Sequence, residues 1–370
     1  MGIWNKTMGI RELQESLGAR FKALNGVDLV ASYGDLSGEW RALVETAGVV
    51  ELSSRGRLCV VGADRRRFLH GQVTNEVSKL GLGDGCFAGL VSAKGKLEMD
   101  LHIFSLEEEL LVDFEPGYHE TIRGRLEAYV IGDDVQIVDA APYYGLVSVQ
   151  GPVSKKVLER LELLRDPPSA DHGIVTVHDD ALGLVYVANN PRVGSVGFDL
   201  FVPQAGLVPL FERMVHAARD LGGRACGFEA WEQARVEAGI PRYGVDMDAT
   251  NLAPETGLER CGISYSKGCY IGQEIIARIR TYGQVTKALR VLGFEGSTGA
   301  LPARGDKLWT LAGKEAGYVT SAVRSVATGH VSGLGYVRKE VNEIGQELVW
   351  KSSDGSFSVK IQGLPFSKSA

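Results

Sequence analysis

The chain is poor in cysteine and lacks the usual metal-binding patterns. Its 370 residues include only five cysteines, an odd number, and none of them forms a CxxC pair. The seven histidines are scattered, with neither an HExxH motif nor a Cys/His cluster at zinc spacing. We therefore expect reduced thiols in a cytoplasmic compartment and no bound metal.

Several nucleotide and hydrolase motifs are also absent. The sequence has no P-loop, no GxGxxG after a predicted strand and no GxSxG elbow. The formal net charge is −6, whereas a broad nucleic-acid surface normally gives a basic balance. These absences argue against nucleotide, hydrolase and nucleic-acid functions, and they leave room for a local basic pocket that binds a small anion. The triplet Arg65-Arg66-Arg67 is most simply a solvated helix face.

Long hydrophobic runs are missing as well. The N-terminal stretch "MGIWNKTMGI" lacks the apolar core of a signal peptide. No apolar run approaches the roughly 18 residues needed to span a bilayer. We expect a protein with no membrane partner.

The elements that the sequence does predict form an α+β pattern followed by a β-rich end. A β-hairpin is expected over 86–104, with its turn at 93–96 and Gly95 free to adopt positive φ. In its second strand Leu97, Met99, Leu101 and Ile103 would share one face, opposite Glu98, Asp100 and His102. Residues 286–370 are glycine-punctuated and predict a separate small barrel or sandwich. Helices are expected at 8–24, 38–47, 64–77, 117–130, 153–164, 205–221, 227–239 and after 271.

The stretch "KGCYIGQE" at 267–274 is the first candidate for chemistry. Cys269 precedes a predicted helix, whose N-terminal dipole end favours a thiolate, and Lys267 adds positive charge two residues away. The stretch predicts either a reactive or metal-handling thiol or a cysteine that acts as a small buried hydrophobe. For Cys261, eight residues earlier, core filling is the favoured interpretation.

Two carboxylates are further candidates. Glu237 ends the helix expected at 227–239, where a carboxylate could accept two hydrogen bonds from an amidine-like edge such as that of a guanine or a pterin, or could simply be solvated. Asp100 lies in the middle of a strand, where aspartate is disfavoured. Its side chain is therefore either solvated or placed for a ligand.

Several blocks together resemble one protein family. "KGCYIGQE" followed by "IIARIRTYG" resembles the signature of YgfZ-type folate-binding proteins, which are paralogues of the glycine-cleavage T-protein and act in the maturation of iron–sulfur enzymes. The resemblance covers roughly residues 50–360. The other similar blocks are "FLHGQVTNEV" (68–77), "SAKGKLEMDLHIF" (92–104), "RVEAGIPRYGVDMD" (235–248), "NLAPETGL" (251–258), "GYVTSAV" and "GLGYVR".

This resemblance implies an architecture of two α+β lobes that form a folate site, plus a C-terminal β-barrel. The implied domains are an N-terminal helical extension at 1–50, a folate-binding region at 51–285 and the barrel at 286–370. Within the folate-binding region, one lobe would comprise about 51–140 with 228–285, and the other 141–227. The N-terminal segment of fifty residues is longer than we expect for the compact YgfZ-type proteins. We expect a monomer, because three lobes can bury their hydrophobic cores without a second chain.

The resemblance also implies roles for individual residues. Glu237 falls where the superfamily's glutamate holds the pterin, and Asp100 falls at or next to the aspartate that faces the reacting nitrogens in aminomethyltransferases. Tyr243 and Arg278 are pocket candidates, and Arg278 could pair with the anionic tail of folate. Cys269, Gln273 and Glu274 favour the YgfZ-type branch, and Glu274 could orient Lys267 or the helix start.

Three functions remain open from the sequence. The first is a tetrahydrofolate-binding protein that supports iron–sulfur cluster assembly or repair in client proteins through Cys269, with Lys267 helping to keep the thiol ionised. The second is a folate-dependent aminomethyltransferase in which Asp100 positions the folate nitrogen. The third is a non-enzymatic folate-binding module.

Overall fold

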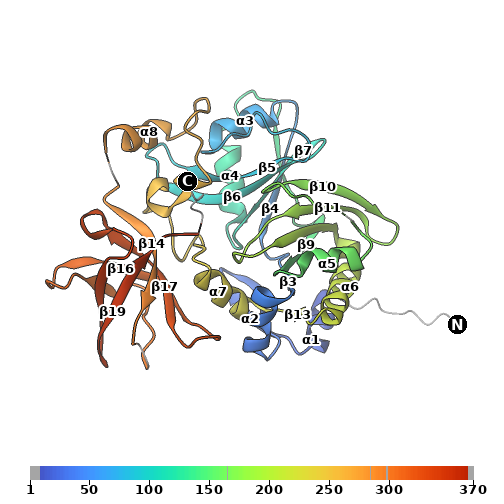
Figure 1. Cartoon of the computed structure of the whole chain (residues 1–370). Helices are drawn as coiled ribbons and strands as arrows, with labels where there is room; N and C mark the ends of the chain where they lie inside the picture. The colour runs from blue at the N-terminus through green and yellow to red at the C-terminus, as the bar shows by residue number, and fades with distance from the viewer. Residues whose placement is uncertain (1–8, 165, 284, 297–298, 366–370) are drawn as a thin grey trace. The chain divides into compact units, whose positions relative to one another are not determined.

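The computed structural model describes residues 9–164, 166–283, 285–296 and 299–365. Its chain divides into two compact units, and most of their helices and strands are labelled in Figure 1. The first unit takes Met1–Arg57 and Asp139–Glu232, and the second takes Leu58–Val138 and Gln233–Ala370. The second unit holds every site residue predicted from the sequence.

The first unit is built on a six-stranded sheet of order β10-β11-β12-β9-β3-β13. Its strands are antiparallel except for β13, which runs parallel to β3. Helix α6 packs on β9 and β3, and its buried residues, including Phe211 and Met214, enter the core of this unit. The strands are β3 (Gly48–Glu51), β9 (Tyr144–Gln150), β10 (Ile174–Asp179), β11 (Gly183–Asn189), β12 (Gly197–Pro203) and β13 (Arg224–Ala225). The helices are α1 (Ile10–Ser16), α2 (Leu36–Glu45), α5 (Ser154–Arg160), η1 (Gln204–Gly206) and α6 (Leu207–Asp220).

The helix predicted over residues 8–24 is wrong in its second half. Helix α1 ends at Ser16, and the following residues form a hairpin of β1 (Arg20–Leu24) with β2 (Val27–Ser32). Asn25 and Gly26 connect the two strands with φ values of 50° and 82°. An Asn-Gly pair adopts this left-handed geometry readily and selects a tight hairpin, so the turn overrides the helical pattern around it.

The second unit contains a five-stranded sheet of order β5-β6-β7-β4-β8. The hairpin expected at 86–104 is confirmed as β5 and β6, with Gly95 at a φ of 68°. The predicted alternation is confirmed too, because Leu97, Met99, Leu101 and Ile103 are fully buried while Asp100 and its face are half-buried. The strands are β4 (Gly56–Val61), β5 (Gly85–Val91), β6 (Leu97–Ser105), β7 (Glu109–Phe114) and β8 (Gln136–Asp139). The helices are α3 (Arg65–Gln72), α4 (His119–Glu127), η2 (Ala253–Thr256), η3 (Leu258–Arg260) and α8 (Gln273–Tyr282). Helix α7 (Phe228–Glu237) begins in the first unit and enters the second at Gln233.

The helix predicted at 64–77 is shorter than expected. Helix α3 ends at Gln72, and Asp64 occupies its N-cap without capping it. The Asp64 carboxylate instead accepts a hydrogen bond from the main-chain N–H of Asp134 at 3.0 Å. It therefore ties the start of the helix to the segment that leads into β8.

The C-terminal part of the second unit is a closed barrel, which confirms the predicted fold class of two α+β parts and a barrel. Its order is β14-β17-β16-β15-β18-β19, and β19 closes on β14. Trp350 fills the interior, and its indole N–H donates to Asp306 at 2.9 Å. The elements are β14 (Lys287–Phe294), β15 (Lys307–Trp309), β16 (Glu315–Arg324), β17 (Val331–Arg338), η4 (Lys339–Val341), β18 (Glu347–Ser352) and β19 (Gly355–Gln362). Among the helices of the described ranges, none has the length and apolar character to cross a membrane.

Candidate functional site

Asp246 fixes the loop that follows α7. Its carboxylate is fully buried and ion-paired with Arg235 of α7. It also accepts hydrogen bonds from the hydroxyls of Thr320 and Ser321 on barrel strand β16, each at 2.6 Å. A buried charge with this many donors holds its surroundings in one arrangement. The loop carrying Tyr243 is thus attached to both the helix and the barrel.

Tyr243 is buried against a second tyrosine. The rings of Tyr243 and Tyr118 meet edge to face, with centroids 5.3 Å apart. Gly244 has a φ of 83°, and a Cβ atom there would lie 2.6 Å from the Tyr118 hydroxyl. A glycine is therefore needed at this position for the two rings to meet. Burial raises the pKa of Tyr243, with Tyr118, Asp248 and Asp100 adding to the rise.

Asp100 lies close to both Tyr243 and the Cys261 thiol. It pairs with Gly89 across the β5–β6 hairpin. Although Cys261 as a whole residue is exposed, burial of its thiol, together with the charge of Asp100, raises the thiol pKa to about 12. Asp100 thus acts electrostatically on a phenol and a thiol in the same neighbourhood.

Thr74 joins the strands of this region to the segment that contains Cys261. Its hydroxyl donates to the carbonyl of Gly262 at 2.5 Å and accepts from the N–H of Gly89 at 2.8 Å. Both partners neighbour the group just described, since Gly89 faces Asp100 and Gly262 follows Cys261. One buried hydroxyl therefore sets the spacing between the carboxylate strand and the thiol.

Glu98 lies on the same face of β6 as Asp100 and forms an ion pair. Its carboxylate lies 2.7 Å from the Arg125 guanidinium of α4. Arg125 also donates to the side chain of Gln72 and to the carbonyl of Val91. Glu98 and Arg125 therefore support the sheet beside Asp100.

Lys267 points into the protein. Its ammonium donates to three main-chain carbonyls at the end of α3, those of His70 (2.5 Å), Val73 (2.7 Å) and Asn75 (2.9 Å). The side chain is buried, and burial lowers its pKa to about 8. These contacts give Lys267 a structural role, and its predicted part in ionising Cys269 stays a prediction.

Cys269 is exposed and lies in the loop before α8. The N-cap of that helix is Gly272, with a φ of 81°, so Tyr270 and Ile271 separate the cysteine from the cap. A Cβ atom at Gly272 would lie 2.4 Å from the Ser92 carbonyl in the β5–β6 turn. The helix start thus packs on the hairpin that carries Asp100.

Three further residues that were predicted for the site, Gln273, Glu274 and Arg278, lie in α8. Gln273 is the first residue of α8. Glu274 is ion-paired with Arg278 at 2.8 Å, one turn further along the exposed face of the helix. The pair follows from the i, i+4 spacing on a helix. The carboxylate of Glu274 therefore lies with Arg278, whereas Lys267 is held by the carbonyls of α3.

Glu237 is the last residue of α7 and is half-buried. Its carboxylate accepts a hydrogen bond from the Gln233 side chain, one turn earlier. Gln233 also donates to the carbonyl of Arg324 at 2.9 Å. The glutamate is thus held near the end of β16, and its predicted role toward a pterin stays a prediction.

The structure brings Asp100 and Tyr243 together, and it adds Tyr118, Cys261 and Thr74, which the sequence did not single out for this site. No local sequence signal marks these three, because they come from separate segments that meet only in the fold. Within the described part of the chain, no group of three or more acidic, histidine or cysteine side chains could hold a metal ion.

Comparisons with known proteins agree on the family. Residues 10–263 match the GCVT N-terminal domain, and residues 289–368 match the glycine cleavage T-protein C-terminal barrel domain. The chain is 26% identical to an aminomethyltransferase of Corynebacterium jeikeium, over 98% of both chains. It is 30% identical to a putative chloroplastic transferase of Arabidopsis thaliana, over 81% of this chain and 67% of that protein. The crystal structure of the glycine cleavage system aminomethyltransferase T from Bartonella henselae superposes with a TM-score of 0.85 at 20% identity, over 96% of both chains.

Proposed function

Because this chain belongs to the glycine cleavage T-protein family, we propose that it binds tetrahydrofolate and acts in one-carbon transfer on it. The observation that carries the proposal is the setting of Asp100, half-buried in mid-strand and electrostatically coupled to Tyr243. Mid-strand aspartate is disfavoured unless it serves some purpose. The relatives named aminomethyltransferase support the same reaction class.

The residues present fit a reduced pterin. Such a ring is planar and carries an N–H-rich amidine edge, which calls for carboxylate acceptors and for aromatic or apolar walls. Glu237 and Asp100 supply carboxylates, and Tyr243 and Tyr118 supply rings. In this proposal Glu237 accepts hydrogen bonds from the amidine edge, and Arg278 pairs with the anionic tail of folate.

Tetrahydrofolate would supply the nitrogens that receive the one-carbon unit. The contribution of Asp100 would be to accept a hydrogen bond and to stabilise positive charge beside those nitrogens. Thr74 and the Tyr118–Tyr243 pair would keep the neighbourhood of this carboxylate fixed. Positioning and electrostatics would thus provide the catalysis, without a covalent bond to the protein.

The first experiment is a titration of tryptophan fluorescence with tetrahydrofolate. Wild type is expected to bind, and Glu237→Ala is expected to bind about tenfold or more weakly, because a charge-assisted pair is lost. Glu229→Ala, which removes the exposed glutamate in the first turn of the same helix, is the matched control and should bind like wild type. Undetectable binding by wild type at millimolar ligand would contradict the proposal.

A second experiment measures transfer directly. Lipoyl carrier protein loaded with its aminomethyl adduct, together with tetrahydrofolate, should yield methylene-tetrahydrofolate, ammonia and the free dihydrolipoyl carrier protein. Asp100→Asn is expected to lower the rate about a hundredfold while folate affinity changes little, since only charge is removed. No turnover above background by wild type would remove the transferase and leave a folate-binding module.

One observation favours a second candidate function. The Cys269 thiol is exposed in a loop with glycines at 268 and 272, where a partner can reach it. We therefore also propose, on the resemblance to YgfZ-type proteins, that the chain supports assembly or repair of iron–sulfur enzymes through this thiol. In a deletion strain, Cys269→Ser should fail to restore activity of an iron–sulfur enzyme, whereas Cys59→Ser, which changes a buried cysteine, should restore it if the variant folds. Full restoration by Cys269→Ser would count against the thiol.

A further inference from the structure

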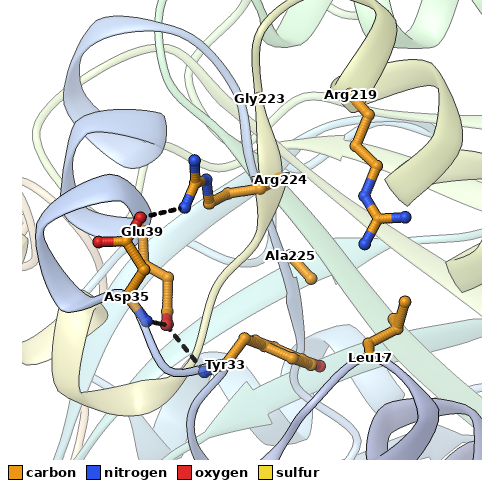
Figure 2. A pocket seen from close by; sticks show the side chains of 8 residues that line it. All are labelled: Leu17, Tyr33, Asp35, Glu39, Arg219, Gly223, Arg224 and Ala225. Atoms are coloured by element: carbon orange, nitrogen blue, oxygen red, sulfur yellow. Dashed lines mark hydrogen bonds and ion pairs between the residues drawn. The ribbon is translucent and has the colours of Figure 1, made fainter.

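The first unit contains a cavity of about 230 Å³ that has no part in the site above. Its walls come from the end of α1, the β2–α2 connection, α2, the last turn of α6 and the turn into β13 (Figure 2). That volume is room for roughly seven or eight water molecules at about 30 Å³ each. The cavity therefore has room for a small metabolite.

The acidic groups in the wall are already satisfied by the protein. Glu39 is fully buried, and its carboxylate accepts from the main-chain N–H groups of Tyr33 and Gly227, both at 2.8 Å. Asp35 is ion-paired with Arg224 at 2.6 Å. Figure 2 shows the contacts of Glu39 with Tyr33 and of Asp35 with Arg224 on one side of the cavity. These contacts stabilise the wall, and because both carboxylates already have donors, they are poor ligands for a cation.

Two donors in the wall remain available. Among the described residues, no carboxylate lies within ion-pair distance of the Arg219 guanidinium, and none accepts a hydrogen bond from the Tyr33 hydroxyl. Figure 2 shows both groups directed toward the part of the cavity where Leu17 lies. Burial raises the pKa of Tyr33, with Glu51 adding to the rise, so the phenol stays a hydrogen-bond donor at neutral pH. A guanidinium and a phenol are a suitable pair for one oxyanion.

We propose that this cavity is a binding site for a small monocarboxylate. The carboxylate would accept from the Arg219 guanidinium and the Tyr33 hydroxyl, and the apolar body would lie against Leu17 and Ala225. The wall carries two carboxylates, Asp35 and Glu39, and two guanidiniums, Arg219 and Arg224, so a dianion would leave more uncompensated negative charge than a carboxylate would, and a phosphate is the poorer fit. A few convergent polar groups beside apolar walls are the usual composition of small-molecule sites.

Calorimetric titration of the full chain with butyrate, benzoate and inorganic phosphate tests this site. Butyrate or benzoate is expected to bind with a dissociation constant on the order of 1 mM, and phosphate more weakly. Arg219→Gln should weaken carboxylate binding about tenfold, and Tyr33→Phe several-fold, because each removes one donor to the anion. Glu237→Ala should leave carboxylate binding unchanged, which separates this site from folate binding.

Arg160→Gln is the matched control, since Arg160 is another exposed arginine of the first unit without an ion pair among the described residues. It should bind like wild type. The proposal is overturned if neither carboxylate binds at about 50 mM, far above the expected constant. It is also overturned if Arg219→Gln binds like wild type, if Arg160→Gln weakens binding equally, or if phosphate binds more tightly than both carboxylates.

Discussion

The ammonium of Lys267 donates to the carbonyl of Val73 at 2.7 Å, across 194 positions of the chain. Two further carbonyls, of His70 and Asn75, share the same ammonium. The N–H of Ile271 adds a hydrogen bond to the carbonyl of Gly71 at 3.1 Å. The loop that contains Cys269 is therefore hydrogen-bonded to the end of α3. Residues 70–75 and 267–271, which are far apart in the chain, are held together by these bonds.

Replacing Lys267 with methionine should destabilise the protein by about 3 kcal/mol, because three buried carbonyls lose a charged donor while the volume is kept. Urea unfolding measures the loss. Lys314→Met, at an exposed lysine of the barrel, should cost less than about 0.5 kcal/mol. Equal stability of Lys267→Met and wild type would show that the three contacts contribute nothing.

Gly272→Ala should be more destabilising than Gly313→Ala. Both glycines have φ values near 80°, so each substitution carries a left-handed penalty of about 1 kcal/mol. Only at Gly272 would the new Cβ meet a backbone atom, the Ser92 carbonyl at 2.4 Å, whereas nothing lies within 4 Å at Gly313. We expect a total loss of roughly 2–4 kcal/mol for Gly272→Ala. Equal urea midpoints for the two variants would contradict the close packing at the helix start.

Asp246→Asn should cost about 3–5 kcal/mol, because it removes the buried negative charge that pairs with the Arg235 guanidinium. Glu15→Gln removes one partner of an exposed ion pair with Arg11 and should cost less than about 0.5 kcal/mol. The same Asp246 variant should weaken folate binding, since the loop carrying Tyr243 loses its attachment. A stable Asp246→Asn protein would argue against this network as the anchor of the loop.

Cys86 is expected to lower stability as pH rises above about 9, whereas Lys267, whose pKa burial lowers from 10.5 to about 8, contributes in the opposite direction between those two values. Burial raises the pKa of this thiol from 9.0 to about 12, against the lowering effect of Lys267. A folded-state pKa above the unfolded one means that the contribution is complete below about pH 9 and is lost as pH rises toward 12. The decline is up to about 1.4 kcal/mol per pH unit. Urea unfolding of Cys86→Ala between pH 9 and 11 should show a shallower decline than wild type, with no such difference in slope near pH 7.

The sequence predicts local features of the fold well and its long-range contacts poorly. The β5–β6 hairpin follows from Gly95 and from the alternation around Asp100, which are visible in a short stretch. Asn25-Gly26 likewise marks the turn of the β1–β2 hairpin, although the residues before it show a helical pattern. At that position the turn chemistry decides the structure, since no helix can continue through it.

In the candidate site, too, the features that depend on local sequence could be predicted, and those that depend on tertiary contacts could not. Asp100 stands out because aspartate is unusual in mid-strand, and the Glu274–Arg278 pair could have been predicted from helical spacing alone. The environment of Lys267 could not, because its partners are main-chain carbonyls far along the chain, and a carbonyl has no sequence signature. Cys261 and Thr74 likewise reach the neighbourhood of Asp100 only through tertiary contacts.

The barrel strand β16 supplies the hydroxyls of Thr320 and Ser321 to Asp246, three residues from Tyr243 in the chain. Substitutions in β16 can therefore change the position of Tyr243, which packs against Tyr118 near Asp100. Homologues could retune ligand preference by exchanging a hydroxyl for a methyl group in the barrel, leaving every ligand-contacting side chain as it was.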